Sequence, residues 1–120
     1  MTDEASTARL VEIRSYKLKP GSLDAFHRTV VERALPMLRE AGMEIVAFGP
    51  SAHEPDCYFL ARAFADLPDL ERQQAAFYGS EAWRQGPREA VVGLIETYLN
   101  TLLWLSPVAI EDLRRRNHHP

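Results

Sequence analysis

The sequence predicts an α+β domain in which four antiparallel strands and two helical regions follow one another in the ferredoxin-like order β-α-β-β-α-β. Apolar residues alternate with a period of two in four segments, and they recur with helical spacing in the two long segments between them. The composition is that of one globular domain, because the 120 residues are 46% hydrophobic and 26% charged. We therefore expect a single four-stranded sheet with helices on one face.

The first strand is predicted over residues 10–18, where β-branched and aromatic side chains alternate with polar ones. Val11 and Ile13 share one side of this strand. The other side carries polar and aromatic groups, from Glu12, Arg14 and Tyr16. Pro20 and Gly21 end the strand, because both residues favour a turn.

A helix is predicted next, with Ser22 as its N-cap and Gly42 as the glycine that ends it. Apolar residues recur three and four positions apart through residues 23–41. Pro36 lies inside this helix and removes one backbone hydrogen bond. We therefore expect a kink or a break near residues 33–35.

A hairpin is predicted over residues 43–48 and 57–64, because both segments are rich in strand-forming residues. The segment between them, GPSAHEPD, is rich in turn-forming residues. The two strands are therefore expected to be antiparallel neighbours.

The second helical region is predicted to start at Asp66, an N-cap with proline close to the first helical position. Two breaks divide it, at Gly79-Ser80 and at Gly86-Pro87, and Ser80 is expected to cap a short turn that holds Trp83. Helical spacing then resumes through Ala90, Val91, Leu94, Ile95 and Tyr98. The region is therefore expected to be segmented but helical throughout.

The last strand is predicted to be short, residues 102–105, and Ser106 and Pro107 close it. The segment VAIEDLRRRNHHP is expected to add one or two helical turns, with three arginines near the negative end of the helix dipole. We place the domain boundaries accordingly: an N-terminal tail (1–9), a domain (10–106) and a C-terminal extension (107–120).

Three of the predicted strands carry large apolar side chains on both faces. In the second strand, Val46 and Phe48 are expected to oppose Ile45 and Ala47. The other two alternate in the same way, with Tyr58, Leu60 and Phe64 opposing Cys57, Phe59 and Ala61, and with Leu102 and Trp104 opposing Leu103 and Leu105. Two helical regions cover only one face of a sheet, and a bare apolar face is rare on a monomer. We therefore expect a homodimer whose subunits pack through their sheet faces.

Composition and charge argue against several partners and locations. The net charge of -3 argues against nucleic acid, which needs a basic face. The longest uncharged run, residues 97–110, is shorter than a bilayer requires, so we expect no membrane span. The first residues, MTDEASTARL, are acidic and lack an apolar stretch, which predicts a cytoplasmic protein.

Two stretches of sequence resemble the NIPSNAP family. The first is Glu12-x-Arg14-x-Tyr16, followed by Lys19-Pro20-Gly21 and a long helix, and the second is Ser80-Glu81-Ala82-Trp83. The resemblance covers residues 11–105, and the arginine-rich tail has no counterpart in it. It implies a dimeric α/β barrel, in which two ferredoxin-like subunits pair their sheets. It supplies no catalytic set, because the wider superfamily includes cofactor-independent monooxygenases, haem-degrading enzymes and proteins with no known reaction.

The best cluster of polar groups is on the predicted first strand. Arg14 shares a side with Glu12 and Tyr16, and a guanidinium among apolar walls can fix a ligand carboxylate or carbonyl. Arg62, on the same face of the hairpin as Tyr58, is expected to join this network or to cap the rim of the barrel. A structural role stays open, since an interface arginine commonly pairs with a carboxylate such as Glu12 or with the partner subunit.

Three more side chains are candidates on the helices. His27 lies beside the stripe that faces the sheet, where it can act as a general base or be held by a backbone carbonyl. Tyr78 and Trp83 lie where the second helical region breaks, and they can line a cavity or pack in the core. His53 has no second histidine at ligand spacing, and the chain lacks a phosphate-cradling glycine loop, so we expect neither a metal nor a cofactor.

Three functions remain open. The first is a NIPSNAP-like homodimer that binds a small apolar or aromatic molecule between sheet and helices, through Arg14, Tyr16, His27, Tyr58, Arg62, Tyr78 and Trp83. The second is a cofactor-independent monooxygenase or isomerase of a small aromatic substrate, in which His27 or Tyr16 moves a proton and Arg14 or Arg62 steadies an oxyanion. The third is a non-catalytic assembly protein. A pocket of about 300 Å³ or more favours the first two, and a solid core favours the third.

Overall fold

The computed structural model describes residues 7–117 and confirms the predicted sheet. Its four strands are β1 (Arg9–Leu18), β2 (Glu44–Pro50), β3 (Cys57–Phe64) and β4 (Ile95–Leu105). They form one antiparallel sheet in the order β2-β3-β1-β4, so β2 and β4 are its edges. The predicted N-terminal tail and C-terminal extension each fall partly outside the described residues.

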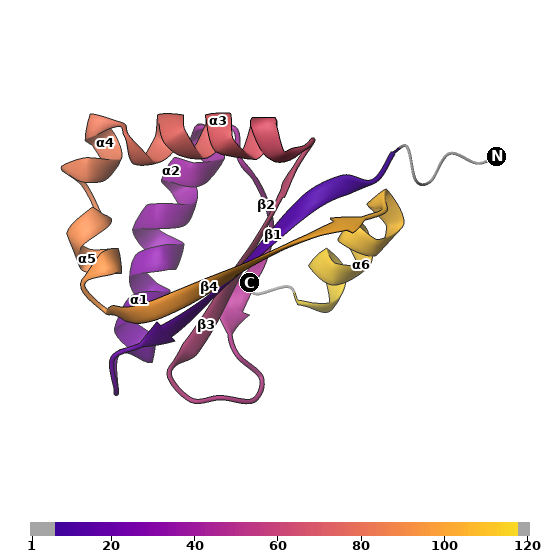
Figure 1. Ribbon diagram of the computed structural model, residues 1–120. Helices are drawn as coiled ribbons and strands as arrows, with labels where there is room; N and C mark the ends of the chain where they lie inside the picture. The colour runs from indigo at the N-terminus through magenta and orange to yellow at the C-terminus, as the bar shows by residue number, and fades with distance from the viewer. Residues whose placement is uncertain (1–6, 118–120) are drawn as a thin grey trace.

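The helices are α1 (Leu23–Thr29), the π-helical turn η1 (Val30–Ala34), α2 (Leu35–Glu40), α3 (Leu67–Tyr78), α4 (Glu81–Arg84), α5 (Arg88–Val92) and α6 (Pro107–Arg116). Helices α1 to α5 lie on one side of the sheet, and α6 lies on the other (Figure 1). We call the side toward α1–α5 the inner face and the side toward α6 the outer face. None of the helices in residues 7–117 has the length and apolarity needed to cross a membrane.

The predicted break in the first helix is confirmed. It takes the form of the π-helical turn η1, directly before Pro36 in the first turn of α2. The wider turn accommodates a proline that cannot donate to the preceding carbonyl. Gly42 follows the helix with a φ of +90°, as a helix-ending glycine does. The capping prediction for Ser22 is wrong in one respect, because its hydroxyl donates to the Lys19 carbonyl at 2.6 Å and makes no cap bond to α1.

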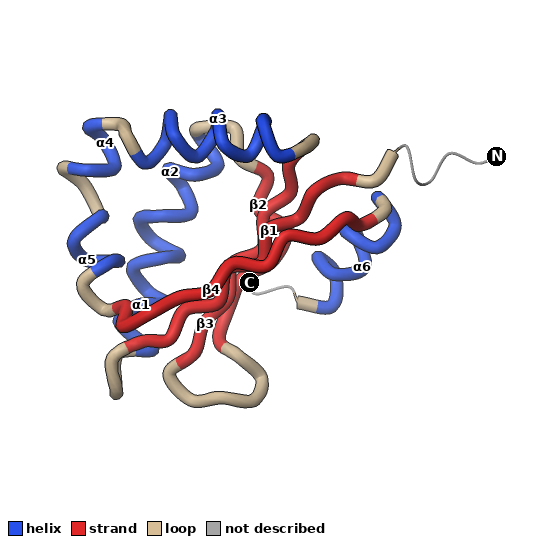
Figure 2. The backbone as a smooth tube through the Cα atoms, in the orientation of Figure 1, coloured by secondary structure: helices blue, strands red, loops and turns tan. Residues whose placement is uncertain are grey.

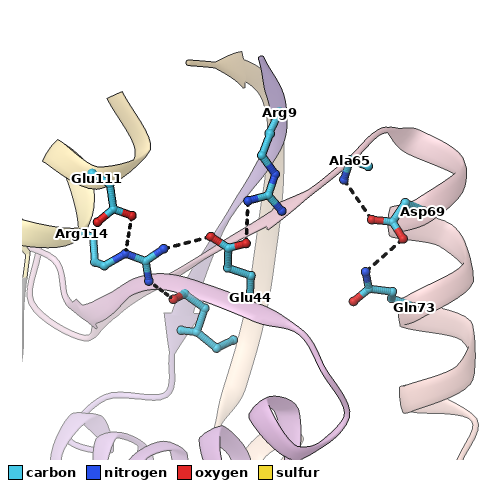
Figure 3. Close-up of polar contacts among 8 residues, drawn as sticks. Arg9, Glu44, Ala65, Asp69, Gln73, Glu111 and Arg114 are labelled. Atoms are coloured by element: carbon cyan, nitrogen blue, oxygen red, sulfur yellow. Dashed lines mark hydrogen bonds and ion pairs between the residues drawn. The ribbon is translucent and has the colours of Figure 1, made fainter. Parts of the chain in front are cut away.

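The start of the second helical region follows the prediction. The Asp66 carboxylate accepts a hydrogen bond from the Asp69 amide at 2.9 Å, which caps α3. Asp69 in turn accepts from the Ala65 amide and from the Gln73 side chain (Figure 3). The Ser80 hydroxyl accepts from the Trp83 amide at 3.3 Å, which caps the short helix α4.

The end of this region differs from the prediction. Helix α5 ends at Val92 and β4 begins at Ile95, so Ile95 and Tyr98 are strand residues. Strand β4 has 11 residues where four were expected, and it pairs with β1 over the whole length of that 10-residue strand. Helical spacing is a local signal, and here the pairing with the free edge of β1 outweighs it.

The alternation predicted for β2 is also wrong at one point. The register with β3 shifts between Ile45 and Ala47, which is a β-bulge. Val46 and Ala47 therefore both pack on the outer face, while Ile45 and Phe48 pack on the inner face with the helices. The expectation that Val46 would share a face with Phe48 is thus incorrect.

The sequence predicts a bare outer face, but α6 covers one end of it (Figure 2). Helix α6 is longer than the predicted one or two turns, and its Ile110 is buried against Val11 and Ala61 of the sheet. Arg114 fastens it by donating to the Ile45 carbonyl at 2.8 Å and to Glu44 at 3.0 Å (Figure 3).

The neighbouring arginines are paired within α6 itself. Arg115 and Arg116 both bond to Asp112, at 3.1 and 2.9 Å. Each of the three arginines is therefore paired with an acidic group of the same helix or of β2.

Candidate functional site

The inner face of the sheet carries three rows of side chains that the strand register sets side by side. The first row is Tyr98, Tyr16 and Tyr58, from β4, β1 and β3. The second row is Asn100, Arg14 and Leu60, and the third is Leu102, Glu12 and Arg62. Glu12, Arg14 and Tyr16 alternate along β1, so the polar side predicted for this strand faces the helices.

A buried ion pair joins β1, β3 and α3 in the third row. Glu12 is 1% exposed and Arg62 is 0% exposed. Arg62 donates to Glu12 Oε1 from Nη2 at 2.6 Å and from Nε at 3.1 Å, and it donates from Nη1 to the Tyr78 hydroxyl at 2.7 Å. Gln74 adds a bond from Nε2 to the same carboxylate oxygen at 2.9 Å. We call Glu12, Arg14, Arg62, Gln74 and Tyr78 the Glu12 network.

The electrostatics keep this pair charged. Burial alone raises the pKa of Glu12, but the charges of Arg62 and Arg14 and the hydrogen bond from Gln74 outweigh it, so the pKa lies below the ordinary value. Burial likewise acts to lower the pKa of Arg62, and the neighbouring Tyr78 and Glu12 outweigh it and raise that pKa. Arg62 and Arg14 therefore belong to one network, because both bond to the carboxylate of Glu12. Of the two roles expected for Arg62, joining this network or capping the rim of the barrel, this is the first.

Arg14 stands at the edge of the same network and is only slightly exposed. It donates from Nη2 to Glu12 Oε2 at 3.2 Å and from Nε to Asn100 Oδ1 at 2.8 Å. The guanidinium carbon lies 5.1 Å from the ring centre of Tyr98 and 5.9 Å from that of Tyr78. Cation–π contacts and two hydrogen bonds therefore fix its orientation.

Arg14 forms part of the wall of a pocket of about 740 Å³ between the sheet and helices α3 to α5. We call this the main pocket; its lining is Arg14, Tyr16, Tyr78, Trp83, Arg88, Val91, Val92, Ile95, Glu96, Thr97 and Tyr98. Four of these side chains are aromatic, and Tyr78 and Trp83 meet edge to face with ring centres 5.5 Å apart. A much smaller cavity of about 30 Å³ lies deeper, against Phe26 and Tyr58.

Tyr16 lines both the main pocket and the deeper cavity, as do Tyr78, Trp83 and Val91. Burial and the neighbouring Tyr78 raise the pKa of Tyr16 to about 12, although Arg14 and Arg62 act in the opposite direction. Its phenol is thus protonated at neutral pH and can donate a hydrogen bond into the pocket. Burial and Tyr16 likewise raise the pKa of Tyr58.

The predicted site residues divide into two groups. Arg14, Tyr16, Tyr78 and Trp83 line the main pocket together. Three others stand outside that lining: Tyr58 lines the deeper cavity, Arg62 bonds to Tyr78, and Nδ1 of His27 lies 2.6 Å from the Tyr58 hydroxyl. His27 therefore lies outside the lining of the main pocket, next to Tyr58.

Sequence reasoning missed most of the α5 and β4 side of the main pocket, and it missed three residues that contact Arg14 or Glu12. Asn100 and Tyr98 hold Arg14, and Gln74 bonds to Glu12. Tyr98 and Asn100 follow from alternation once β4 is started at Ile95, because they then pair with Tyr16 and Arg14. The sequence predicts a helix through Tyr98 and a last strand that starts at Leu102, which hides this signal.

Metal ligation gains no support from the part of the chain that the structure describes. Residues 7–117 contain no group of three or more His, Cys, Asp and Glu side chains placed to hold an ion. His53 pairs with Glu54 at 3.2 Å, and both are exposed in the loop between β2 and β3.

Neither a protein-family model nor a curated protein matches the sequence, but solved structures match the fold. A NIPSNAP family protein with unknown function from Agrobacterium tumefaciens has a TM-score of 0.76 at 23% identity, covering 83% of this chain and 90% of the other. An uncharacterized NIPSNAP-like domain protein from Burkholderia xenovorans has a TM-score of 0.76 at 19% identity, covering 84% and 88%.

A more distant match is a putative antibiotic biosynthesis monooxygenase from Nitrosomonas europaea, with a TM-score of 0.59 at 19% identity, covering 78% of this chain and 95% of the other. Its lower score places it behind the two NIPSNAP structures in similarity of fold. Sequence identity at these levels carries the fold and not the activity. The chain therefore has the α+β fold seen in solved NIPSNAP proteins, as the sequence motifs had indicated.

Proposed function

We propose that this chain is a NIPSNAP-like protein that binds a small apolar or aromatic molecule in the main pocket. The observation that carries the proposal is the pocket itself, whose 740 Å³ falls within the range of about 300 to 1,000 Å³ of small-molecule sites. Its walls combine aromatic and aliphatic side chains with one oriented guanidinium, which is the usual composition of such sites.

The polar part of the pocket is held rigidly before any ligand arrives. Arg14 is fixed by Asn100 and Glu12, and Glu12 is fixed by Arg62 and Gln74. A site with fixed side chains loses less conformational entropy when a ligand binds. This rigidity supports a binding role over a purely structural one for Arg14.

A neutral aromatic dye and two matched variants test the proposal. Val92, 42% exposed on α5, lines the main pocket, whereas Val31, 39% exposed on η1, does not. We expect the neutral solvatochromic dye Prodan to bind with a blue-shifted emission. The bulky substitution Val92→Trp should weaken this binding by occupying part of the pocket, and Val31→Trp should leave it intact. Equal binding by Val92→Trp and Val31→Trp, or no binding at all, would contradict the proposal.

We also propose a homodimer, through the part of the outer face that α6 leaves open and through β4. The open part contains Ile13 and Phe59, which are only partly buried, and Leu99, which is 76% exposed. On β4, Tyr98, Leu102 and Trp104 are also exposed. A long, apolar edge strand is a liability in a monomer, and a second copy would cover it.

The oligomeric state tests this interface directly. Leu67 is 45% exposed on α3, a helix on the inner side of the sheet (Figure 1), which makes it a control for Leu99 on the outer side. We expect sedimentation velocity to show a dimer for the unaltered protein and for Leu67→Asp, and a monomer for Leu99→Asp. A monomeric unaltered protein at micromolar concentration, or a dimeric Leu99→Asp protein, would overturn the proposed interface.

A second function, a cofactor-independent monooxygenase or isomerase, has one observation in its favour. Tyr16, protonated at neutral pH, and Arg14 both line the main pocket, where a phenol and a guanidinium can stabilise an oxyanion. Oxygen uptake with the phenolic probe dithranol, lost on Tyr16→Phe, is the result expected of a monooxygenase. No uptake by the unaltered protein would count against that activity while leaving the binding role in place.

A further inference from the structure

The Glu12 network, beside the main pocket, carries one more positive charge than negative. Arg14 and Arg62 share the single carboxylate of Glu12, and the other groups that bond to this trio, among them Gln74 and Asn100, are neutral. At the open rim of the pocket, Arg88 pairs with Glu89 at 2.8 Å and Glu96 adds a negative charge, so the excess positive charge is confined to the network around Arg14. A local excess of positive charge favours an anionic ligand.

Of these two arginines, Arg14 and not Arg62 can offer its positive charge to a ligand in the main pocket. Arg62 is fully buried, makes two bonds to Glu12 and one to Tyr78, and lies outside the lining of the main pocket. Arg14 lines the pocket and bonds to Glu12, Asn100 and the Tyr16 hydroxyl, which are three partners for the five N–H groups of a guanidinium. Donors therefore remain on Arg14 for a ligand.

The neighbouring rings define the rest of the ligand. The guanidinium of Arg14 lies within 5.9 Å of the ring centres of both Tyr78 and Tyr98, and Trp83 packs against Tyr78. A ligand group bound to Arg14 thus has aromatic surfaces around it, against which a planar ring can stack. A carboxylate, with two coplanar oxygens, matches the geometry of a guanidinium better than a single oxygen does.

Resting on the binding function proposed above, we propose that the ligand of the main pocket is an aromatic monocarboxylate. Its carboxylate bonds to Arg14, and its ring lies among Tyr78, Trp83 and Tyr98. A single negative charge neutralises the excess, whereas a second would be repelled by Glu12 and Glu96. The proposed ligand is thus a planar organic acid with one negative charge, which is more specific than an apolar or aromatic molecule in general.

Three probes of similar shape test the charge preference by calorimetry: cinnamate with one charge, cinnamamide with none, and para-carboxycinnamate with two. We expect cinnamate to bind about tenfold or more tightly than either of the others, as charged hydrogen bonds of this kind allow. Arg14→Gln should bring cinnamate and cinnamamide to within about twofold of each other. The fold should survive this change, because Glu12 keeps Arg62 and Gln74.

A matched control and the dye separate the ways in which the inference can fail. Arg28→Gln removes the same charge from an exposed position on α1 and should keep the preference for cinnamate. Equal binding of cinnamate and cinnamamide to the unaltered protein, or a preference that survives Arg14→Gln, would overturn the inference. If Prodan binds and neither cinnamate nor cinnamamide does, the carboxylate inference alone is wrong. If Prodan does not bind either, the proposed function fails with it.

Discussion

Replacing Arg62 with methionine removes half of the hydrogen bonds that hold a buried carboxylate. Glu12 accepts four bonds, two of them from Arg62 and one each from Gln74 and Arg14. Breaking a buried ion pair by removing one partner costs about 3 to 5 kcal/mol, because the remaining charge stays buried. We expect Arg62→Met to lower the free energy of unfolding by about that amount.

The same substitution at Arg9 provides the control. Arg9 pairs with Glu44, and both side chains are about one-third exposed, so water solvates the carboxylate when the arginine is lost. We expect Arg9→Met to change the free energy of unfolding by less than about 1 kcal/mol. Urea unfolding followed by circular dichroism, at one fixed protein concentration, measures both variants in the same way.

The pH dependence makes the test specific to charge. The pKa of Glu12 in the folded protein lies below its unfolded value, so the stability that Glu12 supplies is present above the unfolded pKa and is lost as the pH falls through the folded pKa. Without Arg62, burial weighs more heavily and the folded pKa rises. The penalty of Arg62→Met should therefore shrink from about pH 7 to about pH 4.5, the ordinary pKa of a glutamate, because the raised pKa of Glu12 in the variant favours its neutral form, which needs less compensation. A penalty below about 1 kcal/mol, or one equal at both pH values, would refute this reasoning.

Three further substitutions test other parts of the fold by urea unfolding. Ile110→Ala should cost about 2 to 5 kcal/mol, because Ile110 is the buried anchor of α6 on the outer face, and a smaller loss would show that α6 is loosely held. Ser106→Ala should cost about 1 kcal/mol through loss of the α6 cap, and Ser106→Asp, which can still cap, should restore most of it. Tyr58→Phe should cost about 1 kcal/mol by removing the contact with His27; an unchanged midpoint would show that this contact adds nothing to stability.

The parts of the fold that the sequence predicts well are those with local causes. Asp66 and Ser80 cap their helices through hydrogen bonds to residues three positions away, and Pro36 lies in the first turn of the helix that follows the π-helical turn η1. These signals depend on nearest neighbours along the chain, so the residue type is enough to place them.

The parts that the sequence does not predict depend on contacts between distant segments. Ile95 and Tyr98 fit helical spacing, and only the free edge of β1 makes them strand residues. The bulge at Val46 likewise depends on the register with β3. The sequence does not identify Asn100 as a site residue, because its position beside Arg14 depends on where β4 begins.

The candidate site shows the same division. The period of β1 places Glu12, Arg14 and Tyr16 on one face, and this prediction is confirmed. The distance of His27 from the main pocket depends on how α1 packs on the sheet, which the helical spacing does not determine.

A crystal structure of the protein grown with cinnamate tests the central claim most directly. We predict electron density for the ligand in the main pocket, with its carboxylate within hydrogen-bond distance of the Arg14 guanidinium and its ring against Tyr98 or Trp83. A main pocket filled only by solvent at saturating cinnamate, or a ligand bound elsewhere on the molecule, would contradict the account.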